Sequence, residues 1–493
     1  MTASALLPLL VAGPLVGAFV ATGLTRPAAR RALGLLVSAA VLAGSVLLVM
    51  ATRDGQVVVA QVAGWPGGIA IPFAADPLSA LMVLVASLLV TTCLAFAAAT
   101  GDDLDRWFVP LALVLSGGVY GAFVTADLFN LFVLVEVALI PSYVLLTAGG
   151  RPEQVRAGRI YLTVNLLGST ILLAGIALLY GVTGSVNLGE LAGAAADSNA
   201  AALAAGVVLV AFGVKAALVP AHGWLPATYP SAPPAVTALF SGLLTKIGVY
   251  AIFRVYAVVF DGDARLSSVL LVVFLATMVV GVLGALGEGR MRSILVFHMI
   301  SQVGYILLGL SFFGVLGVTA GIFYFLHNTV VKASLLLTAG AVETTHGTDR
   351  LDRLGGLARR EPLLAVAFFA AAVSLAGLPP FSGFVAKLVL VRAAFAEQAY
   401  LAGGLAVVVS LFTLLSMMKI WNGVFWGEPP DQPPAEPAVE VPRIPRSLVW
   451  PGVVLAGVSL AVGLGAELVL GLSQTAAEGL VDPSDYVDAV SGR

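Results

Sequence analysis

The sequence predicts an all-α polytopic membrane protein that forms a single membrane domain over residues 1–493. Its composition indicates this first, because 59% of the residues are hydrophobic and only 11% are charged, whereas soluble proteins carry about 25% charged residues. The second indication is the recurrence of apolar stretches of about 20 residues, the length at which a helix crosses a bilayer. The net charge of −2 gives no reason to expect nucleic acid as a partner, since its phosphates call for a strongly basic face.

About fourteen apolar stretches qualify as transmembrane helices. They begin near residues 3, 32, 77, 107, 127, 159, 201, 235, 267, 293, 317, 364, 402 and 448. The first lacks a basic segment before it and is expected to be a retained helix, not a cleaved signal. Three connections are longer than the rest, namely 52–76, the Gly/Ala-rich 181–200 and 427–447. The last is rich in proline and acidic residues, so we expect an extended cytoplasmic loop.

The distribution of arginine residues predicts the orientation in the membrane. Arginines crowd into the odd-numbered connections, for example 26–31, 151–159 and 350–360, and few lie on the even-numbered side, among them Arg254. Positively charged loops stay in the cytoplasm, so the odd-numbered loops are expected inside. An even number of spans then places both termini on the outer side of the cell membrane.

Two predicted spans are interrupted by prolines at related places. The segment VKAALVPAHGWLP contains Pro220 and Pro226, and LAGLPPFSGFVAK contains Pro379 and Pro380. Interrupted helices in corresponding positions of two halves are typical of repeated transporter folds with ion sites at the breaks. The breaks lie about 160 residues apart, so each half is expected to hold about five helices.

The five lysines of the chain all fall within or at the edge of apolar spans, while nearly every arginine lies in a connection. A charge at the bilayer centre costs about 2.5 to 3.5 kcal/mol on insertion scales, so a buried lysine needs a partner or a hydrated cavity. Lysine also suits proton relay, because burial can bring its pKa towards neutral pH. For Lys419, near a span end, snorkelling to the interface explains the position. We expect functional roles for Lys215, Lys246, Lys332 and Lys387.

One acidic residue, Glu136, stands alone among apolar neighbours in DLFNLFVLVEVALIPSYVLL. A lone buried carboxylate would be protonated, but near a lysine it can ionise and exchange charge with an incoming proton. Lys215 is the expected partner. Asp127 begins the same helix and is expected to cap it. Glu467 is a second acid expected inside the last span, with no assigned role.

The four histidines add groups that titrate near neutrality. His327 precedes Lys332 by five residues, so the two are expected to flank one polar cavity. His298 is expected in the first half of a span, and His222 follows the first break, where bonding to freed carbonyls and proton relay are both open. His346, with Glu343 and Asp349, is expected in a solvated loop. No two histidines have a ligand-like spacing, and Cys93 is the only cysteine, so we expect neither a metal site nor a disulfide.

Several segments together resemble one family, the antiporter-like membrane subunits shared by Mrp-type multisubunit Na⁺/H⁺ antiporters and the proton-pumping arm of respiratory complex I. They are DLFNLFVLVEV, FGVKAALVPAHGWLPATYPSAPPAVTALFSGLLTKIGVY, ILVFHMISQVGY, HNTVVKASL and SLAGLPPFSGFVAK, and the resemblance runs from about residue 75 to 425. Many complex I members have a histidine in the tenth helix where this chain has Gln302, with His298 one turn earlier. That pattern, with SMMKIWNGVFWG near Lys419, is similar to the D-type member of the Mrp antiporters.

The resemblance implies two inverted five-helix repeats, each with a broken helix, over about 107–258 and 267–424. It also implies a role for each matching residue: Glu136 the acid of the fifth helix, Lys215 the lysine of the first broken helix, Lys246 the central lysine, His327 and Lys332 the connecting pair, and Lys387 the ionisable group of the second broken helix. Some complex I relatives carry a glutamate in place of Lys387.

These residues predict a proton-translocating subunit of a multisubunit cation/proton antiporter, with a row of buried groups along which protons pass. Its expected partners are the other subunits of a hetero-oligomeric complex, protons, Na⁺ or another monovalent cation, and the lipid bilayer. The chain has no dinucleotide fingerprint, iron–sulfur cysteines or haem ligands, so we expect no cofactor. Two alternatives stay open, a proton-pumping subunit of a complex I-type oxidoreductase or membrane hydrogenase, and a scaffold that transports nothing.

Overall fold

The structure is a computed structural model that describes residues 3–61, 71–427 and 443–491. Eleven helices in these residues are long and apolar enough to cross a membrane. They are α1 (Ala3–Gly23), α2 (Pro27–Thr52), α3 (Pro77–Thr100), α5 (Leu128–Thr147), α6 (Pro152–Thr183), α10 (Pro234–Val258), α11 (Ala264–Gly287), α12 (Met291–Ser311), α13 (Val315–His346), α17 (Tyr400–Ile420) and α18 (Arg446–Leu464). Three shorter apolar helices join them, α4 (Phe108–Val124), α8 (Asn199–Lys215) and α15 (Pro362–Ala376).

Each of the fourteen expected spans corresponds to one of these helices. The second and the sixth begin earlier than expected, at Pro27 and Pro152. A proline fits the first turn of a helix, where its missing N–H is not needed, so these helices extend past the apolar stretch into a polar first turn. The remaining helices are short or amphipathic: α7 (Ala194–Asp197), α9 (Trp224–Thr228), α14 (Leu357–Arg360), α16 (Ser382–Ala396), α19 (Ala466–Val481) and α20 (Ser484–Ser491).

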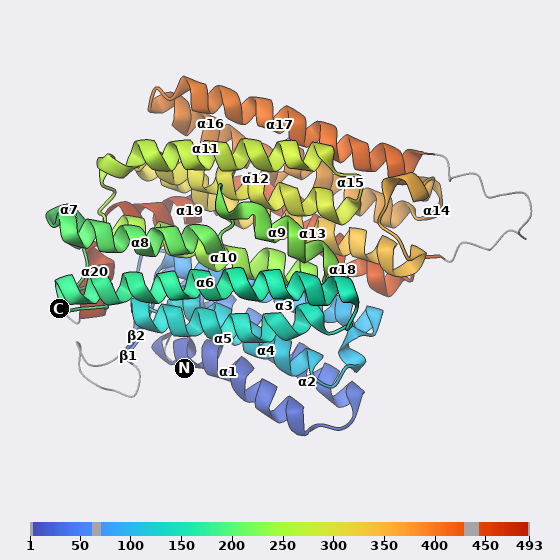
Figure 1. Cartoon of the computed structure of the whole chain (residues 1–493), viewed down its shortest axis with the longest axis horizontal. Helices are drawn as coiled ribbons and strands as arrows, with labels where there is room; N and C mark the ends of the chain where they lie inside the picture. Colours follow the sequence, from blue (N-terminus) through green and yellow to red (C-terminus); the bar gives the residue numbers. More distant parts are fainter. Residues whose placement is uncertain (1–2, 62–70, 428–442, 492–493) are drawn as a thin grey trace, which may run out of the picture.

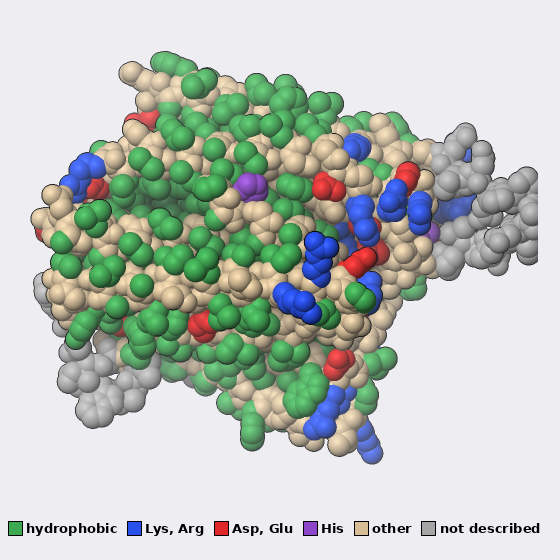
Figure 2. Space-filling model, viewed as in Figure 1, with side chains coloured by type: hydrophobic (Ala, Val, Ile, Leu, Met, Phe, Trp, Pro, Cys, Tyr) green, Lys and Arg blue, Asp and Glu red, His purple; other side chains and the backbone are tan. Residues whose placement is uncertain are grey.

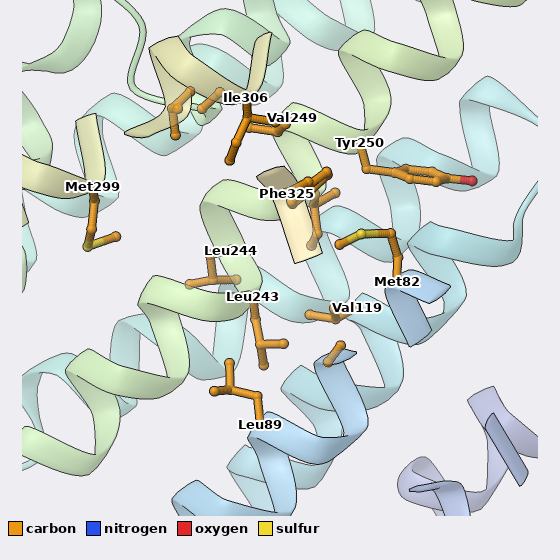
Figure 3. Packing of buried hydrophobic residues seen from close by; sticks show 14 of the residues in the cluster. Met82, Leu89, Val119, Leu243, Leu244, Val249, Tyr250, Met299, Ile306 and Phe325 are labelled. Atoms are coloured by element: carbon orange, nitrogen blue, oxygen red, sulfur yellow. The ribbon is translucent and has the colours of Figure 1, made fainter. Parts of the chain in front are cut away.

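The long helices run side by side in one bundle (Figure 1). Helix α13 lies at its centre and packs against α3, α10, α12, α15, α16, α18 and α19. The most hydrophobic stretches of α10 and α13 are completely buried within the protein, whereas only 33% of the residues in those of α2 and α11 are buried. Figure 3 shows the apolar packing around α10, whose Leu243, Leu244 and Val249 belong to one buried cluster with Leu89 and Phe325. The two central helices are therefore shielded by other helices on every side.

Two details differ from the expectations, and one expected segment lies largely outside the described residues. The 52–76 connection contains a small antiparallel hairpin of β1 (Val58–Gln61) and β2 (Pro72–Ala75). The last span ends at Leu464, so Glu467 is not inside it but in the first turn of the amphipathic helix α19. Of the proline-rich 427–447 segment, residues 428–442 lie outside the described residues.

The two ends of the bundle differ in charge. Figure 2 shows the Lys and Arg side chains of this face gathered mainly at the right-hand end, with a wide hydrophobic surface to their left. The chain termini lie towards the other end, on the left in Figure 1. The arginine-rich connections therefore share one end of the molecule, and both termini lie away from it. The apolar surface between is what a helix bundle presents to lipid.

Candidate functional site

Both predicted helix breaks are present. Helix α8 ends at Lys215, and Ala217 has a φ of +58° before the chain resumes as α9. Helix α15 ends at Ala376, Gly377 follows with a φ of +90°, and α16 begins at Ser382. A break leaves carbonyl groups without their helical partners, and these need other donors when they are buried. Lys387 Nζ is such a donor, since it bonds Ala376 O at 3.0 Å.

The first break holds one end of a three-residue contact. Lys215 Nζ donates to Ser169 Oγ on α6 at 2.9 Å, and Ser169 Oγ donates to Glu136 Oε1 on α5. Lys215 Nζ and Glu136 Oε1 are 4.0 Å apart, with the lysine side chain 5% and the glutamate side chain 22% exposed. The expected pairing of Glu136 with Lys215 is confirmed, with a serine hydroxyl between the two charges. Glu136 is only half-buried, at the edge of the bundle.

A small cavity of about 10 Å³ adjoins Lys215 and reaches α10. It is lined by Val135, Leu139, Tyr161, Asn165, Lys215, Trp224, Leu244 and Ile247. This is close to the smallest volume that holds one water molecule. The cavity therefore brings the first break next to the turn of α10 that carries Lys246.

Lys246 is completely buried. Its Nζ donates to Asn328 Oδ1 on α13 at 3.0 Å and lies 6.0 Å from the centre of the Phe325 ring. No carboxylate among the described residues forms an ion pair with it. Among the described residues, the positive charge of Lys246 is therefore balanced only by one amide oxygen and one ring face.

His327 and Lys332 on α13 make different contacts. Lys332, also fully buried, donates to Leu295 O on α12 at 2.9 Å. His327 Nδ1 lies 2.7 Å from Ser382 Oγ at the start of α16. Five residues turn a helix by more than one full turn, and this directs the two side chains to different neighbours. His327 and Lys332 therefore share no hydrogen-bond partner among the described residues that would indicate the expected common cavity.

Three serine hydroxyls join His327 at the second break. Ser382 Oγ lies 3.0 Å from Ser459 Oγ on α18, and Ser459 Oγ lies 2.9 Å from Ser374 Oγ on α15. All three serines are buried. Hydroxyls both donate and accept, so this cluster can pass a proton by reorienting its hydrogen bonds.

Lys387 is the last of these charged residues and lies on α16, after the second break. Its Nζ lies 5.1 Å from the centre of the Tyr305 ring, and its side chain is 8% exposed. It lines a groove of about 290 Å³ between α12, α15, α16 and α17. Lys387 thus stands at the edge of the bundle, as Glu136 does, while Lys246 and Lys332 lie inside it.

Comparison with known proteins places residues 125–413 in the family described as NADH:quinone oxidoreductase/Mrp antiporter, transmembrane. The chain is 38% identical to the D protein of the Na⁺/H⁺ antiporter of Alkalihalophilus pseudofirmus, over 90% of this chain and 91% of the relative. The identity to the corresponding D protein of Bacillus subtilis is 35%, over 87% of each chain.

The chain belongs to the NADH:quinone oxidoreductase/Mrp antiporter family. It is therefore a polytopic membrane protein, and the resemblance found in its motifs is confirmed. Among solved structures it is similar to a chain of the Mrp complex from Dietzia sp., with 50% identity, a TM-score of 0.96 and 100% of each chain covered. A chain of respiratory complex I from Thermus thermophilus shares the fold, with a TM-score of 0.82 at 24% identity, covering 96% of this chain and 99% of that one.

Three residues predicted with less support have distinct environments in this member of the Mrp antiporter family. His298 is fully buried, with Nε2 2.5 Å from Ser416 Oγ on α17. Lys419 donates to Leu286 O and Glu288 O at 2.9 and 2.6 Å near the molecular surface, in agreement with a helix-end role. His222 is half-buried after the first break, and its Nδ1 has no hydrogen-bond partner among the described residues.

The acidic groups near His346 are not solvated as expected. Arg292 pairs with Glu343 at 2.5 Å, and Arg290 pairs with Asp349 at 2.8 Å. Asp349 is completely buried. These pairs join the ends of α12 and α13, so their role is to hold the bundle together at its basic end.

Sequence reasoning missed the neutral polar residues between the charged ones. Ser169, Asn328 and the three serines of the second break make most of the hydrogen bonds described above. The available signal was a polar residue in an otherwise apolar span, but serine is common in membrane helices and its partner is not visible in a sequence. The charged residues stood out because charge in a membrane is rare.

Several buried polar atoms of the row lack protein partners among the described residues. They are His298 Nδ1, Gln302 Nε2, His327 Nε2 and Asn328 Nδ2. Buried polar atoms are nearly always hydrogen-bonded, and where protein groups do not serve, water does. The four atoms lie on α12 and α13, the helices that carry His298, His327 and Lys332.

Proposed function

We propose that the chain is the proton-translocating subunit of a multisubunit monovalent cation/proton antiporter in the cell membrane. The observation that carries this proposal is the contact of Glu136, Ser169 and Lys215, followed by a row of buried lysines with few countercharges. The relatives in Alkalihalophilus and Bacillus are named as parts of a Na⁺/H⁺ antiporter, which supports Na⁺ as the exchanged cation.

In this proposal protons pass between Glu136 and Lys387 through groups that switch in turn between their charged and neutral forms. Ionised Glu136 favours the charged form of Lys215, because two unit charges 4.0 Å apart interact by about 4 kcal/mol at an effective dielectric constant of 20. Protonation of Glu136 removes that interaction and favours transfer of the lysine proton inward, to Lys246 through water. Each step changes the charge seen by the next group, so the steps are coupled.

The second half uses the hydroxyl cluster. His327 and the serines at the second break lie between α13 and α16, and Lys387 on α16 receives the proton at the edge of the bundle. The two breaks support the proposed repeats over 107–258 and 267–424, one break in each. Because Glu136 and Lys387 both reach the edge, neighbouring subunits are proposed to continue the row, in line with the complex of which the Dietzia relative is part.

A subunit of a redox-driven proton pump is the second candidate. A chain of an archaeal membrane-bound sulfane sulfur reductase has 25% identity and a TM-score of 0.88, covering 98% of this chain. The greater identity to antiporter chains, 50% and 38%, favours the antiporter. The arginine-rich end of the bundle supports a cytoplasmic location for that end and an outer location for both termini.

The test is Na⁺/H⁺ exchange in everted vesicles that carry the whole native complex, comparing wild type with Glu136→Ala at equal assembly. We expect exchange to be lost. Full exchange in the variant would remove Glu136 from the path and would favour a scaffold. Copurified flavin and iron in the complex would instead support the redox pump.

A further inference from the structure

A buried ion pair lies outside the row described above. Arg254, near the end of α10, donates from Nη2 to Asp76 Oδ1 at 2.8 Å, and their side chains are only 2% and 3% exposed. Asp76 also caps α3, since its Oδ1 accepts from Ser79 N at 2.9 Å. Removing two charges from water costs several kcal/mol each, and an apolar pair would often serve stability better. Stability alone therefore does not explain the pair, which indicates a function besides joining α3 to α10.

The ion pair continues a column of polar groups that begins at Lys246. Lys246, Tyr250 and Arg254 are spaced by four residues on α10, so they share one face of the helix at steps of about 6 Å. Tyr250 OH donates to Phe123 O at 2.7 Å, lies 2.9 Å from Ser79 Oγ, and accepts from Arg254 Nη2 at 3.2 Å. Three groups of the pair have no hydrogen-bond partner among the described residues, namely Arg254 Nε, Arg254 Nη1 and Asp76 Oδ2.

The column leads to the end of the bundle where the termini lie. Asp76 directly follows β2, and the guanidinium of Arg254 lies 4.5 Å from the centre of the Tyr486 ring on α20, the last helix. Helix α20 packs against β1 and β2 and so covers this end of the column. Towards Lys246, the column is closed by apolar side chains, and Figure 3 shows Met82 and Phe325 beside Tyr250.

Arginine cannot relay a proton, because its guanidinium stays charged in proteins. It can, however, control the carboxylate beside it. Burial acts to raise the pKa of Asp76, but the charge of Arg254 and its hydrogen bond outweigh this and hold the pKa below its ordinary value. If Arg254 moved away, burial would be opposed only by the hydrogen bonds from Ser79, and the protonated form of Asp76 would be favoured more than it is now.

We propose that the α10 column is the outward branch of the proton path, in which a proton passes from Lys246 by water to the Tyr250 and Ser79 hydroxyls and then to Asp76, and Arg254 is the gate that closes it. This inference rests on the proposed function. In the closed arrangement the positive charge of Arg254 repels a proton arriving from outside. Opening needs two changes. The guanidinium must leave Asp76, and with it Ser79 and Tyr250, to which Nη2 also donates, each at 3.2 Å. Water must also enter between Lys246 and Tyr250, past Met82 and Phe325.

The first experiment removes one hydroxyl. Tyr250→Phe keeps the ring and loses the OH, and Tyr256→Phe is the matched control, a buried tyrosine of the same helix whose OH donates to Asp263 O at 3.1 Å. Na⁺/H⁺ exchange is measured in everted vesicles carrying the native complex. We expect Tyr250→Phe to lower exchange by at least about tenfold, while Tyr256→Phe stays within about twofold of wild type.

Lys246→Met is measured beside them, to separate the two proposals. If Lys246→Met abolishes exchange and Tyr250→Phe retains it, the outward branch is overturned and the proposed function stands. If Lys246→Met retains exchange, the proposed function itself fails.

The second experiment applies even if Tyr250→Phe does not assemble. Arg254→Met removes the gate and keeps Asp76, the proton acceptor of the branch. The purified complex is placed in liposomes with a pH gradient and no Na⁺, and proton leak is followed with an internal pH dye. We expect the leak to rise severalfold and to disappear when Lys246→Met is added. An unchanged leak, or one that persists with Lys246→Met, would overturn the gate.

Discussion

At the second helix break, Gly383 of α16 lies so close to Ser374 of α15 that adding one methyl group tests the geometry of the site. A Cβ atom added at Gly383, in the first turn of α16, would lie 1.7 Å from Ser374 O and 2.9 Å from His327 Cε1, whereas ordinary contact begins at 3.4 Å. The nearest atom is a backbone oxygen at the end of α15, so no side-chain rotation relieves the clash. In Gly383→Ala the two half-helices must therefore separate by about 1.7 Å, a strain of the kind that overpacking produces.

We expect Gly383→Ala to destabilise the complex by at least about 1 to 3 kcal/mol. The separation also lengthens the contact of His327 Nδ1 with Ser382 Oγ, now 2.7 Å, beyond the roughly 3.2 Å at which proton transfer is efficient. Exchange should therefore fall even at temperatures where the complex stays assembled. The assays are the thermal unfolding temperature of the purified complex and Na⁺/H⁺ exchange in vesicles.

Gly457→Ala on α18 is the matched control, since a Cβ there meets no atom of the chain within 4 Å. It should keep both properties, because alanine is favoured over glycine in a helix. Equal unfolding temperatures and equal exchange for the two variants would show that the half-helices are not held as closely as the structure indicates, and the steric reasoning would be refuted.

Three further predictions follow from the contacts. Ser169→Ala should reduce exchange severalfold without abolishing it, because the charges 4.0 Å apart remain and only the bridging hydroxyl is lost; exchange equal to wild type would exclude a relay through Ser169. Asn328→Leu should abolish exchange, since Lys246 loses its hydrogen-bond acceptor, and Asn328→Asp is the informative companion because it restores an acceptor. Arg292→Met should destabilise the complex by about 3 to 5 kcal/mol, because Glu343 is left largely buried without its partner, and a thermal unfolding curve unchanged from wild type would contradict this.

Much of the fold could be predicted because the membrane imposes one simple requirement. Every backbone group in the bilayer must be bonded within its own segment, so each apolar stretch of sufficient length becomes a helix. The errors lie where that requirement is weak. The hairpin of β1 and β2, and helices α19 and α20, follow or connect spans and are not marked by a long apolar run. Glu467 was misplaced for the same reason.

The site was predictable to the extent that its residues are charged. Lys215, Lys246, Lys332 and Lys387 were singled out from the cost of burying them, and the structure buries all four. Arg254 shows the limit of this reasoning. It was grouped with the arginines of the connections by its position near a span end, yet it is buried and paired with Asp76, which is 178 residues away in the chain. A sequence does not show which charges meet.

The sequence by itself determined the class of the protein, the helical spans, the two breaks and the charged residues, because hydrophobicity, proline and charge act locally and can be read one segment at a time. The tertiary structure alone decided the order in which these groups touch. Ser169 between Glu136 and Lys215, and Ser382 and Ser459 beside His327, depend on distances between helices that are far apart in the chain. Those distances are set by side-chain packing between the helices, which no single segment specifies.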